Sequence, residues 1–295
     1  MGSHGKWLAL TAALVMSCGG GDEEFSPDQF SITNGAGIAV SVGADGSVWT
    51  TTDDREWVDQ GAFIDGTLAA VARGDGLFVA VGEGGAIIGS VDGKRWETSL
   101  SPTTVDLGGV VYAEGRYVAV GDAGVILTSE DGIVWRSVDS NTSASLNAVT
   151  WGDGRFVAVG DAGAISISDD GLSWRSSDVE AGLNFLGIAH GGVFLAVGEF
   201  GLTARSLDGE SWELLSIVSA PNLNAVTRGS GIFLIVGDAG VAYTTPNGDR
   251  FARGNSGTSE GLFGATFVVD RFIAIGARGV NRSSFDGITW FGGQF

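Results

Sequence analysis

The sequence predicts an all-β fold, a seven-bladed β-propeller with four antiparallel strands in each blade. Two columns of residues repeat in one register, and each repeat has three turn signals between short apolar runs. A period near forty residues marks one supersecondary unit copied around an axis or along a stack. One column is Gly-x-x-Gly, which begins at Gly43, Gly82, Gly121, Gly160, Gly198, Gly237 and Gly276. The other is Trp57, Trp96, Trp135, Trp174, Trp212, Phe251 and Trp290.

One repeat, residues 146–177, shows how the strands are assigned. Residues 146–151 read as a first strand, and 155–159 form a continuous apolar run that suits a strand covered on both faces. Residues 164–168 alternate apolar and polar side chains, as expected of a strand nearer the surface, and 174–177 open a fourth strand. A parallel β-helix, the alternative architecture, has shorter coils and no need of three hairpin turns in every repeat.

The first and last repeats are the least regular. Ala39 stands where the other repeats carry Phe or Tyr, and Ala277-Arg278 stands in a turn that carries an acid in the five middle repeats. These two repeats become neighbours when the ring closes, so we predict the closing seam between them. Each repeat supplies its four strands from one continuous segment, and no strand exchange between the termini is expected.

The third turn of each repeat has the pattern Ser/Thr-x-Asp-Gly-x-x-Trp. An aspartate at such a turn accepts backbone N–H groups that would otherwise be unsatisfied. The glycine takes the positive φ, and the tryptophan packs the outer strand against a neighbouring blade. We therefore assign a structural role, in preference to calcium or ligand binding, to the aspartates of the five complete copies: Asp92, Asp131, Asp170, Asp208 and Asp286.

This turn resembles the Asp-box, or bacterial neuraminidase repeat, of the sialidase superfamily, although the usual box has one more residue between Asp and Gly. The whole repeat is more similar to the propellers of photosystem II assembly and stability factors, whose turn is one residue longer. The resemblance implies the fold and, by analogy alone, a role in assembling an envelope complex. A sialidase needs an arginine cluster and a tyrosine nucleophile. The tyrosines here occupy ordinary repeat positions, so we do not infer that activity.

Residues 1–17 are predicted to be a lipoprotein signal peptide. Lys6 precedes an apolar run over residues 7–16, which is too short to span a bilayer. Val15-Met16-Ser17-Cys18 resembles the bacterial lipobox, which implies cleavage before Cys18 and lipidation of its thiol. The alternative is an incidental cysteine near a generic signal peptide.

The predicted organisation continues with a lipidated cysteine and flexible tether over residues 18–29 and the propeller over 30–295. Gly19 after the cysteine favours the outer membrane, so the protein is expected to be exported and anchored in the bacterial cell envelope. With one cysteine in the chain, neither a disulfide framework nor a thiolate metal cluster is expected. The net charge of −19 repels phosphate backbones and argues against nucleic-acid binding. We predict a monomer without cofactor or metal.

Five consecutive repeats carry an acid in the second turn: Glu83, Asp122, Asp161, Glu199 and Asp238. Propellers generally bind partners on the face that bears the longer links between blades, and these turns belong to that face. The acids form a candidate binding rim that would attract a cationic ligand, a basic partner or divalent cations. The alternative is that Asp and Glu simply suit a hairpin turn.

On the opposite face, the end of the first strand carries the most varied column of the repeat: Asn34, Arg73, Tyr112, Trp151, His190, Arg228 and Phe267. We treat Arg73, Tyr112, Trp151, His190 and Arg228 as a second candidate rim. The alternative is solvent exposure without constraint. His190, alone near a turn, is expected to be an exposed side chain.

The leading hypothesis is a non-catalytic envelope lipoprotein whose propeller binds a protein or a glycan as an assembly scaffold. The repeats are regular, their loops are short, and no residue is assigned a catalytic role. The alternative is a carbohydrate-active enzyme, similar to a glycoside hydrolase, that uses carboxylates of the acidic rim.

Overall fold

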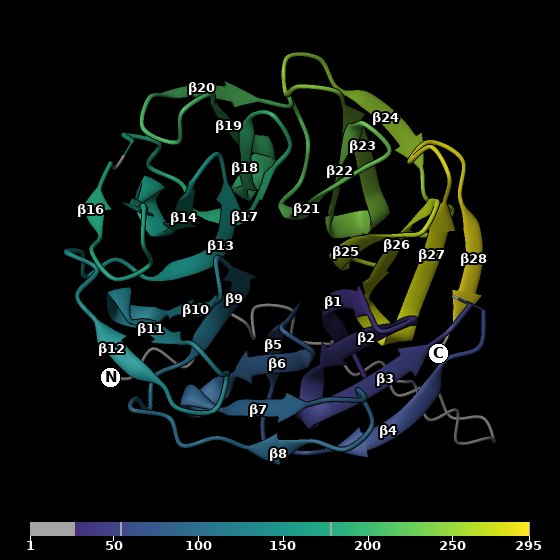
Figure 1. Ribbon diagram of the computed structural model, residues 1–295. Helices are drawn as coiled ribbons and strands as arrows, with labels where there is room; N and C mark the ends of the chain where they lie inside the picture. The colour runs from purple at the N-terminus through teal and green to yellow at the C-terminus, as the bar shows by residue number, and fades with distance from the viewer. Residues whose placement is uncertain (1–26, 54, 178, 295) are drawn as a thin grey trace, which may run out of the picture.

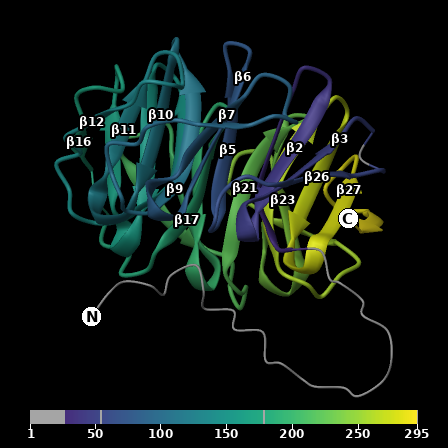
Figure 2. The same ribbon diagram turned by 90° about the horizontal axis from the view of Figure 1, so that it is seen from below.

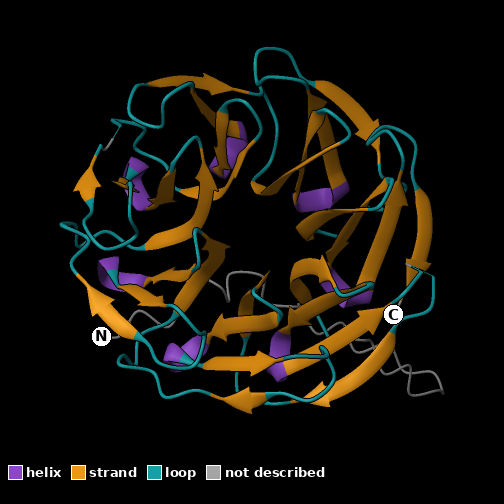
Figure 3. Cartoon of the chain, viewed as in Figure 1, coloured by secondary structure: helices purple, strands orange, loops and turns teal. Residues whose placement is uncertain are grey.

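The computed structural model describes residues 27–53, 55–177 and 179–294. These residues form seven four-stranded antiparallel sheets, which stand as blades around a central axis and close into a ring (Figure 1). The blades pack face to face, and the ring is a thick disc when it is seen from the side (Figure 2). In the described part of the chain the helical elements are seven short 3-10 turns, one in each blade (Figure 3). This architecture confirms the predicted all-β, seven-bladed propeller.

Each blade is one continuous segment of chain, whose strands follow in sequence order from the axis to the rim. The inner strands are β1 (Gln29–Gly35), β5 (Leu68–Gly74), β9 (Leu107–Ala113), β13 (Leu146–Gly152), β17 (Phe185–His190), β21 (Leu223–Gly229) and β25 (Leu262–Val268). The second strands are β2 (Ile38–Gly43), β6 (Leu77–Gly82), β10 (Arg116–Gly121), β14 (Arg155–Gly160), β18 (Phe194–Gly198), β22 (Ile232–Gly237) and β26 (Arg271–Gly276). No strand is exchanged between the described ends of the chain, as predicted.

The outer half of each blade is built in the same way. The third strands are β3 (Ser47–Thr51), β7 (Ile87–Ser90), β11 (Ile126–Ser129), β15 (Ile165–Ser168), β19 (Leu202–Ser206), β23 (Val241–Thr245) and β27 (Val280–Ser284). The outer strands are β4 (Val58–Ala62), β8 (Glu97–Thr98), β12 (Arg136–Val138), β16 (Arg175–Ser176), β20 (Trp212–Ser216), β24 (Ala252–Asn255) and β28 (Phe291–Gln294). A 3-10 turn joins each second strand to the third: η1 (Ala44–Gly46), η2 (Glu83–Gly85), η3 (Asp122–Gly124), η4 (Asp161–Gly163), η5 (Glu199–Gly201), η6 (Asp238–Gly240) and η7 (Ala277–Gly279).

The core lies between the blades, on both faces of the second and third strands. In β14 every residue after Arg155 is buried, as predicted for a strand covered on both faces. The prediction for β15 is wrong, because its alternating serines are not near the surface. Ser166 and Ser168 are both 0% exposed. Ser168 Oγ donates to Asp170 Oδ1 of its own turn at 3.0 Å, and both sides of the strand are shielded from solvent, so the alternation does not mark an exposed face.

The tryptophan of the third turn packs between blades, as predicted. Trp135 lies in one apolar cluster with Val79 and Val81 of the preceding blade. Its indole Nε1–H donates to the carbonyl of Gly132 at 3.0 Å. This single side chain therefore fixes the turn and holds the outer part of its blade against the preceding one.

The ring closes between the first and seventh blades through a contact that other junctions share. The N–H of Arg278 in η7 donates to Asp28 Oδ1 at 2.8 Å. The equivalent bond between the second and third blades runs from the N–H of Gly84 to Asp106 Oδ1, also at 2.8 Å. The seam is thus closed by an ordinary blade-to-blade contact, and a shared strand is not needed.

The interior of the seam is more polar than the other junctions. Gln29 stands in the position of Leu68, and both Gln29 and Ser41 are fully buried. Ser41 Oγ donates to Gln29 Oε1 at 2.6 Å, and Gln29 Nε2 donates to Ser47 Oγ at 3.0 Å. The other interblade clusters hold seven to eleven buried apolar residues of the described chain. The seam cluster holds four: Ile32, Ala39, Ile273 and Ile275.

The predicted signal peptide and Cys18 lie outside the described residues, and they stay predictions. The first inner strand begins at Gln29, one residue before the predicted start of the propeller. None of the helical elements in the described ranges is long and apolar enough to cross a membrane.

Candidate binding surfaces

The two faces of the ring carry different turns. The 3-10 turns and the starts of the inner strands share one face, because the first N–H of each 3-10 turn donates to the residue before the inner strand of its own blade. We call it the acidic face, since it carries Glu83, Asp122, Asp161, Glu199 and Asp238. The Asp-Gly-Trp turns and the ends of the inner strands share the other, which we call the signature face.

Carboxylates of the acidic face bind the chain of their own blade. Glu199 Oε2 accepts from the N–H of Asn184 at 3.0 Å. Glu83 Oε2 accepts from the N–H of Thr67 at 3.1 Å. Asn184 and Thr67 each precede an inner strand, so these carboxylates tie the 3-10 turn to the segment that enters the blade. Such bonds give the acid of this turn a structural use.

Two asparagines extend these ties to the next blade. Asn147 Nδ2 donates to Asp161 Oδ1 at 3.1 Å and to the carbonyl of Phe185 at 2.8 Å. Asn224 makes the equivalent pair of bonds, to Asp238 Oδ1 at 2.8 Å and to the seventh blade at 3.0 Å. Each asparagine joins its own turn to the neighbouring inner strand, and these two acids therefore take part in blade-to-blade packing.

Asp122 differs from the other four acids of this face. Within the described ranges its carboxylate has no hydrogen bond or ion pair, and the residue is half-buried. It precedes a shallow hollow of about 230 Å³ that is lined by residues 123–126, 137–140 and Thr142. Of the predicted acidic rim, this position is the one with both a free carboxylate and a neighbouring concavity.

The varied column on the signature face is half-buried and held by stacking. Trp151 packs on Phe156 of its own second strand, with ring centroids 4.4 Å apart. The Arg73 guanidinium lies over the Phe78 ring at 5.1 Å. Different residue types therefore fill one packing position between the inner strand and the blade core, and their variety does not by itself mark a binding rim.

His190 belongs to this column, and the expectation that it is exposed is wrong. Its side chain is 15% exposed, and its ring packs at a tilt against that of Phe194, with ring centroids 4.6 Å apart. It also covers Gly152 of the preceding blade, where an added Cβ would lie 2.0 Å from His190 Cγ. Its Nε2 is 3.0 Å from Asp153 Oδ2. The histidine thus packs one blade against the turn of another.

The turn aspartates have the geometry of the structural role predicted for them. Asp208 Oδ1 accepts from the N–H groups of Ser211 and Glu210, both at 2.8 Å, and from Ser206 Oγ at 2.9 Å. The two backbone donors stabilise the charged carboxylate and lower the pKa of Asp208 to about 2. Backbone N–H donors also lower the pKa of the equivalent carboxylates of Asp92, Asp131, Asp170 and Asp286.

In the described part of the chain, no group of three or more His, Cys, Asp or Glu side chains lies close enough together to hold a metal ion. The five acids of the acidic face lie in separate blades, and four of them accept hydrogen bonds from other residues of their own blades. What the surface presents to solvent is charge, backbone and a few large apolar side chains.

Sequence reasoning missed these exposed apolar side chains. Leu100, Ile133 and Val134 are 91%, 60% and 59% exposed, and with Trp135 they line a hollow of about 330 Å³. On the acidic face Phe200 is 70% exposed and has a φ of 50°. Comparison of the repeats could have revealed these apolar side chains, because most copies carry a small, charged or hydroxyl residue at the same positions.

The chain resembles solved propellers in fold. A structure described as YCF48 bound to D1 peptide matches with a TM-score of 0.71 and 16% identity, over 90% of this chain and 95% of that chain. YCF48 from Cyanidioschyzon merolae matches with a TM-score of 0.68 and 16% identity, over 88% and 96%. The computationally designed Ika8 protein matches with a TM-score of 0.65 and 14% identity, over 91% and 88%. No protein-family model and no curated protein sequence matches the chain. At these identities the likeness establishes the fold, and that part of the predicted resemblance is confirmed.

Proposed function

We propose that this protein is a non-catalytic, lipid-anchored propeller of the cell envelope that binds a segment of a partner protein. The observation that carries the proposal is the apolar hollow of about 330 Å³ at the rim of a regular ring. Exposed apolar side chains that gather in one place mark protein-interaction sites or ligand-binding grooves. YCF48, which has a similar fold, is recorded with a bound peptide, and it supports this use of the ring.

The geometry disfavours the carbohydrate-active enzyme. Glycoside hydrolysis needs two carboxylates free to act as acid and base, whereas Asp161 and Glu199 accept hydrogen bonds from asparagines of their own blades. A glycan panel with Glu83→Gln, Asp122→Asn, Asp161→Asn and Glu199→Gln, one at a time, tests this directly. Hydrolysis by the wild type that is lost with one variant and kept with the others would favour the enzyme.

The proposed anchor gives the ring an orientation. The chain enters the propeller on the acidic face, where the N–H of Ala44 in η1 donates to the carbonyl of Asp28 at 2.9 Å. Eight residues, 19–26, separate Cys18 from Pro27, and the nine steps from one Cα to the next reach at most about 30 Å when the chain is fully extended. An anchor at Cys18 would turn the acidic face toward the membrane and leave the signature face and the rim open to a partner.

Two experiments test this proposal. Labelling with radioactive palmitate in a bacterial host should modify the wild type and not Cys18→Ser, because the thiol is the acceptor. A soluble version that begins at Gly19, carrying a photo-crosslinker in place of Val91, which is 72% exposed on the signature face and does not line this hollow, should form one discrete cross-linked protein in envelope extracts. Recovery of glycans without any cross-linked protein would contradict the proposed partner class.

A further inference from the structure

We propose that the hollow between the second and third blades, the rim groove, docks an extended segment that carries a large apolar side chain beside a basic one. The inference rests on the proposed function, for which it names the site and the chemistry of the partner. The groove has a volume of about 330 Å³, enough for one large side chain. It is lined by Thr98, Ser99, Leu100, Ile133, Val134 and Trp135.

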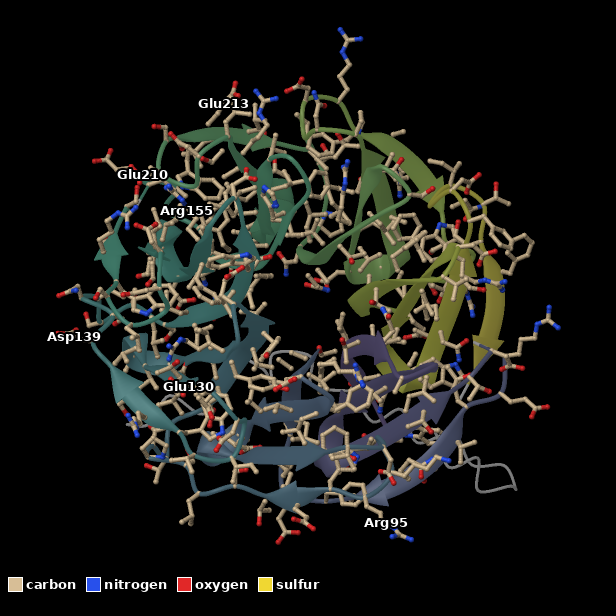
Figure 4. The ribbon with its side chains drawn as sticks, in the orientation of Figure 1. Arg95, Glu130, Asp139, Arg155, Glu210 and Glu213 are labelled. Atoms are coloured by element: carbon tan, nitrogen blue, oxygen red, sulfur yellow. The ribbon has the colours of Figure 1, made fainter. Side chains whose placement is uncertain are left out.

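The other blades show that the fold does not need apolar residues at the wall made by Ile133 and Val134. The same two places after Asp-Gly hold Glu210-Ser211 in the fifth blade. There Glu210 pairs with Arg155 across the junction at 2.8 Å (Figure 4). It also pairs with Arg175 at 2.5 Å. The other pairs are Arg55-Glu56, Lys94-Arg95, Leu172-Ser173, Asp249-Arg250 and Ile288-Thr289. The third blade is thus the copy in which both places are apolar, and both side chains are more than half exposed.

The opposite wall of the groove also carries an apolar residue where the other repeats have a polar residue or glycine. Leu100 stands four residues after the tryptophan of its blade, and it is 91% exposed. The residues at the equivalent places are Gly61, Asp139, Asp178, Ser216, Asn255 and Gln294. Ser99 Oγ donates to the carbonyl of Gly132 at 3.4 Å and joins the two walls. Apolar residues therefore stand on both sides of one junction, Leu100 on one wall and Ile133 and Val134 on the other. None of the three is buried by folding.

The groove lies beside an open strand edge. In the β7–β8 ladder Thr98 is opposite Ile88, and the N–H of Ser99 donates to Ile87 at 2.9 Å. Because N–H and C=O groups alternate in direction along an antiparallel strand, those of Thr98 point away from β7. They can receive the backbone of one more strand. An extended segment paired with Thr98 would place alternate side chains over the groove.

The charge around the groove selects the partner further. Glu97 on β8 is exposed and occupies the place from which Arg175 of the fourth blade reaches Glu210 of the next blade, so it lies on the side of Ile133. Glu130 adds little, because Arg116 pairs with it at 3.8 Å. A segment with a basic residue next to its apolar anchor therefore fits this surface better than an acidic one.

The test is selection of random linear heptapeptides displayed on phage against the wild-type protein, with the double variant Ile133→Glu/Val134→Ser as competitor. This variant copies the residue pair of the fifth blade, so it should fold, and a thermal melt checks that it does. Leu207→Asp is the matched control, because Leu207 is 72% exposed on another blade and the fourth blade carries Asp169 at its position. Selected peptides are then synthesised and titrated by fluorescence anisotropy.

We expect selected peptides to combine an apolar with a basic residue and to bind the double variant at least about tenfold more weakly than the wild type. Leu207→Asp should bind them as the wild type does, and bound peptide should slow hydrogen exchange at Thr98 and Leu100. Peptides that bind the wild type and the double variant equally would overturn the groove and leave the proposed function standing. Failure to select any peptide would also overturn the groove, and the cross-linking experiment would then decide the proposed function separately.

Discussion

The turn aspartates link single residues to the stability of the ring in acid. Backbone N–H groups of Ser211 and Glu210 hold the pKa of Asp208 at about 2, below the ordinary 3.8. A carboxyl with a lowered folded-state pKa contributes stability above pH 3.8 that is lost as the pH falls through about 2. Asp208→Asn should lower the melting temperature at pH 7, and its difference from wild type should shrink between about pH 4 and pH 2. Exposed Glu180→Gln is the control, and a difference that stays constant with pH would contradict the assignment.

Tyr117 is a second residue whose role can be measured alone. Its hydroxyl lies 2.8 Å from the carbonyl oxygen of Leu77 and also within hydrogen-bond distance of that of Gly74, so its one proton is shared between them, and burial raises its pKa to about 12. Tyr117→Phe keeps the packing, since five blades have Phe there, but it leaves two carbonyls without this donor. We expect a loss of about 0.5–1.5 kcal/mol in the free energy of unfolding at pH 8, measured with urea. An unchanged midpoint would show that the hydroxyl is not needed.

At the scale of the element, the 3-10 turns show which positions are under strain. The middle residue of each turn has a positive φ, and Phe200 takes a value of 50° in η5 while its ring is 70% exposed. A left-handed conformation costs a residue with a side chain about 1–2 kcal/mol. Phe200→Gly should therefore raise the free energy of unfolding by up to about 1 kcal/mol. Ala86→Gly, at a φ of −57°, should lower it, and a loss of stability for Phe200→Gly would mean that the ring packs in the folded protein.

At the same scale, the rim is the part of the blade that varies. The inner strands have six or seven residues in every blade, whereas β8 and β16 have two and β20 has five. Inner strands must meet at one axis, so their length is constrained by closure of the ring. The outer strands have no such constraint, and differences in ligand recognition are free to accumulate there.

For the whole molecule, the sequence was enough to predict the number of blades, their strands and the seam, because seven copies of each position separate pattern from noise. It was not enough where a residue's surroundings come from another blade. The burial of Ser166 depends on the neighbouring blades that cover its strand. The packing of His190 depends on Gly152 of the preceding blade. The rim groove needs Leu100 and Ile133 side by side, which only the arrangement of adjacent blades provides.

The seam is where we expect the ring to open first. Asn281 is 4% exposed, lies opposite Ile275 of the seam cluster, and its Nδ2 has no hydrogen-bond partner among the described residues. An unsatisfied buried donor costs about 1–3 kcal/mol, and the first blade carries Val48 at this position. Asn281→Val should therefore raise the melting temperature and slow hydrogen exchange of β1 and β25 amides. Asn224→Val is the matched control and should lower the melting temperature, because that amide makes two bonds. A lower melting temperature for Asn281→Val, with the fold intact by circular dichroism, would show that its amide stabilises the seam and would refute this account.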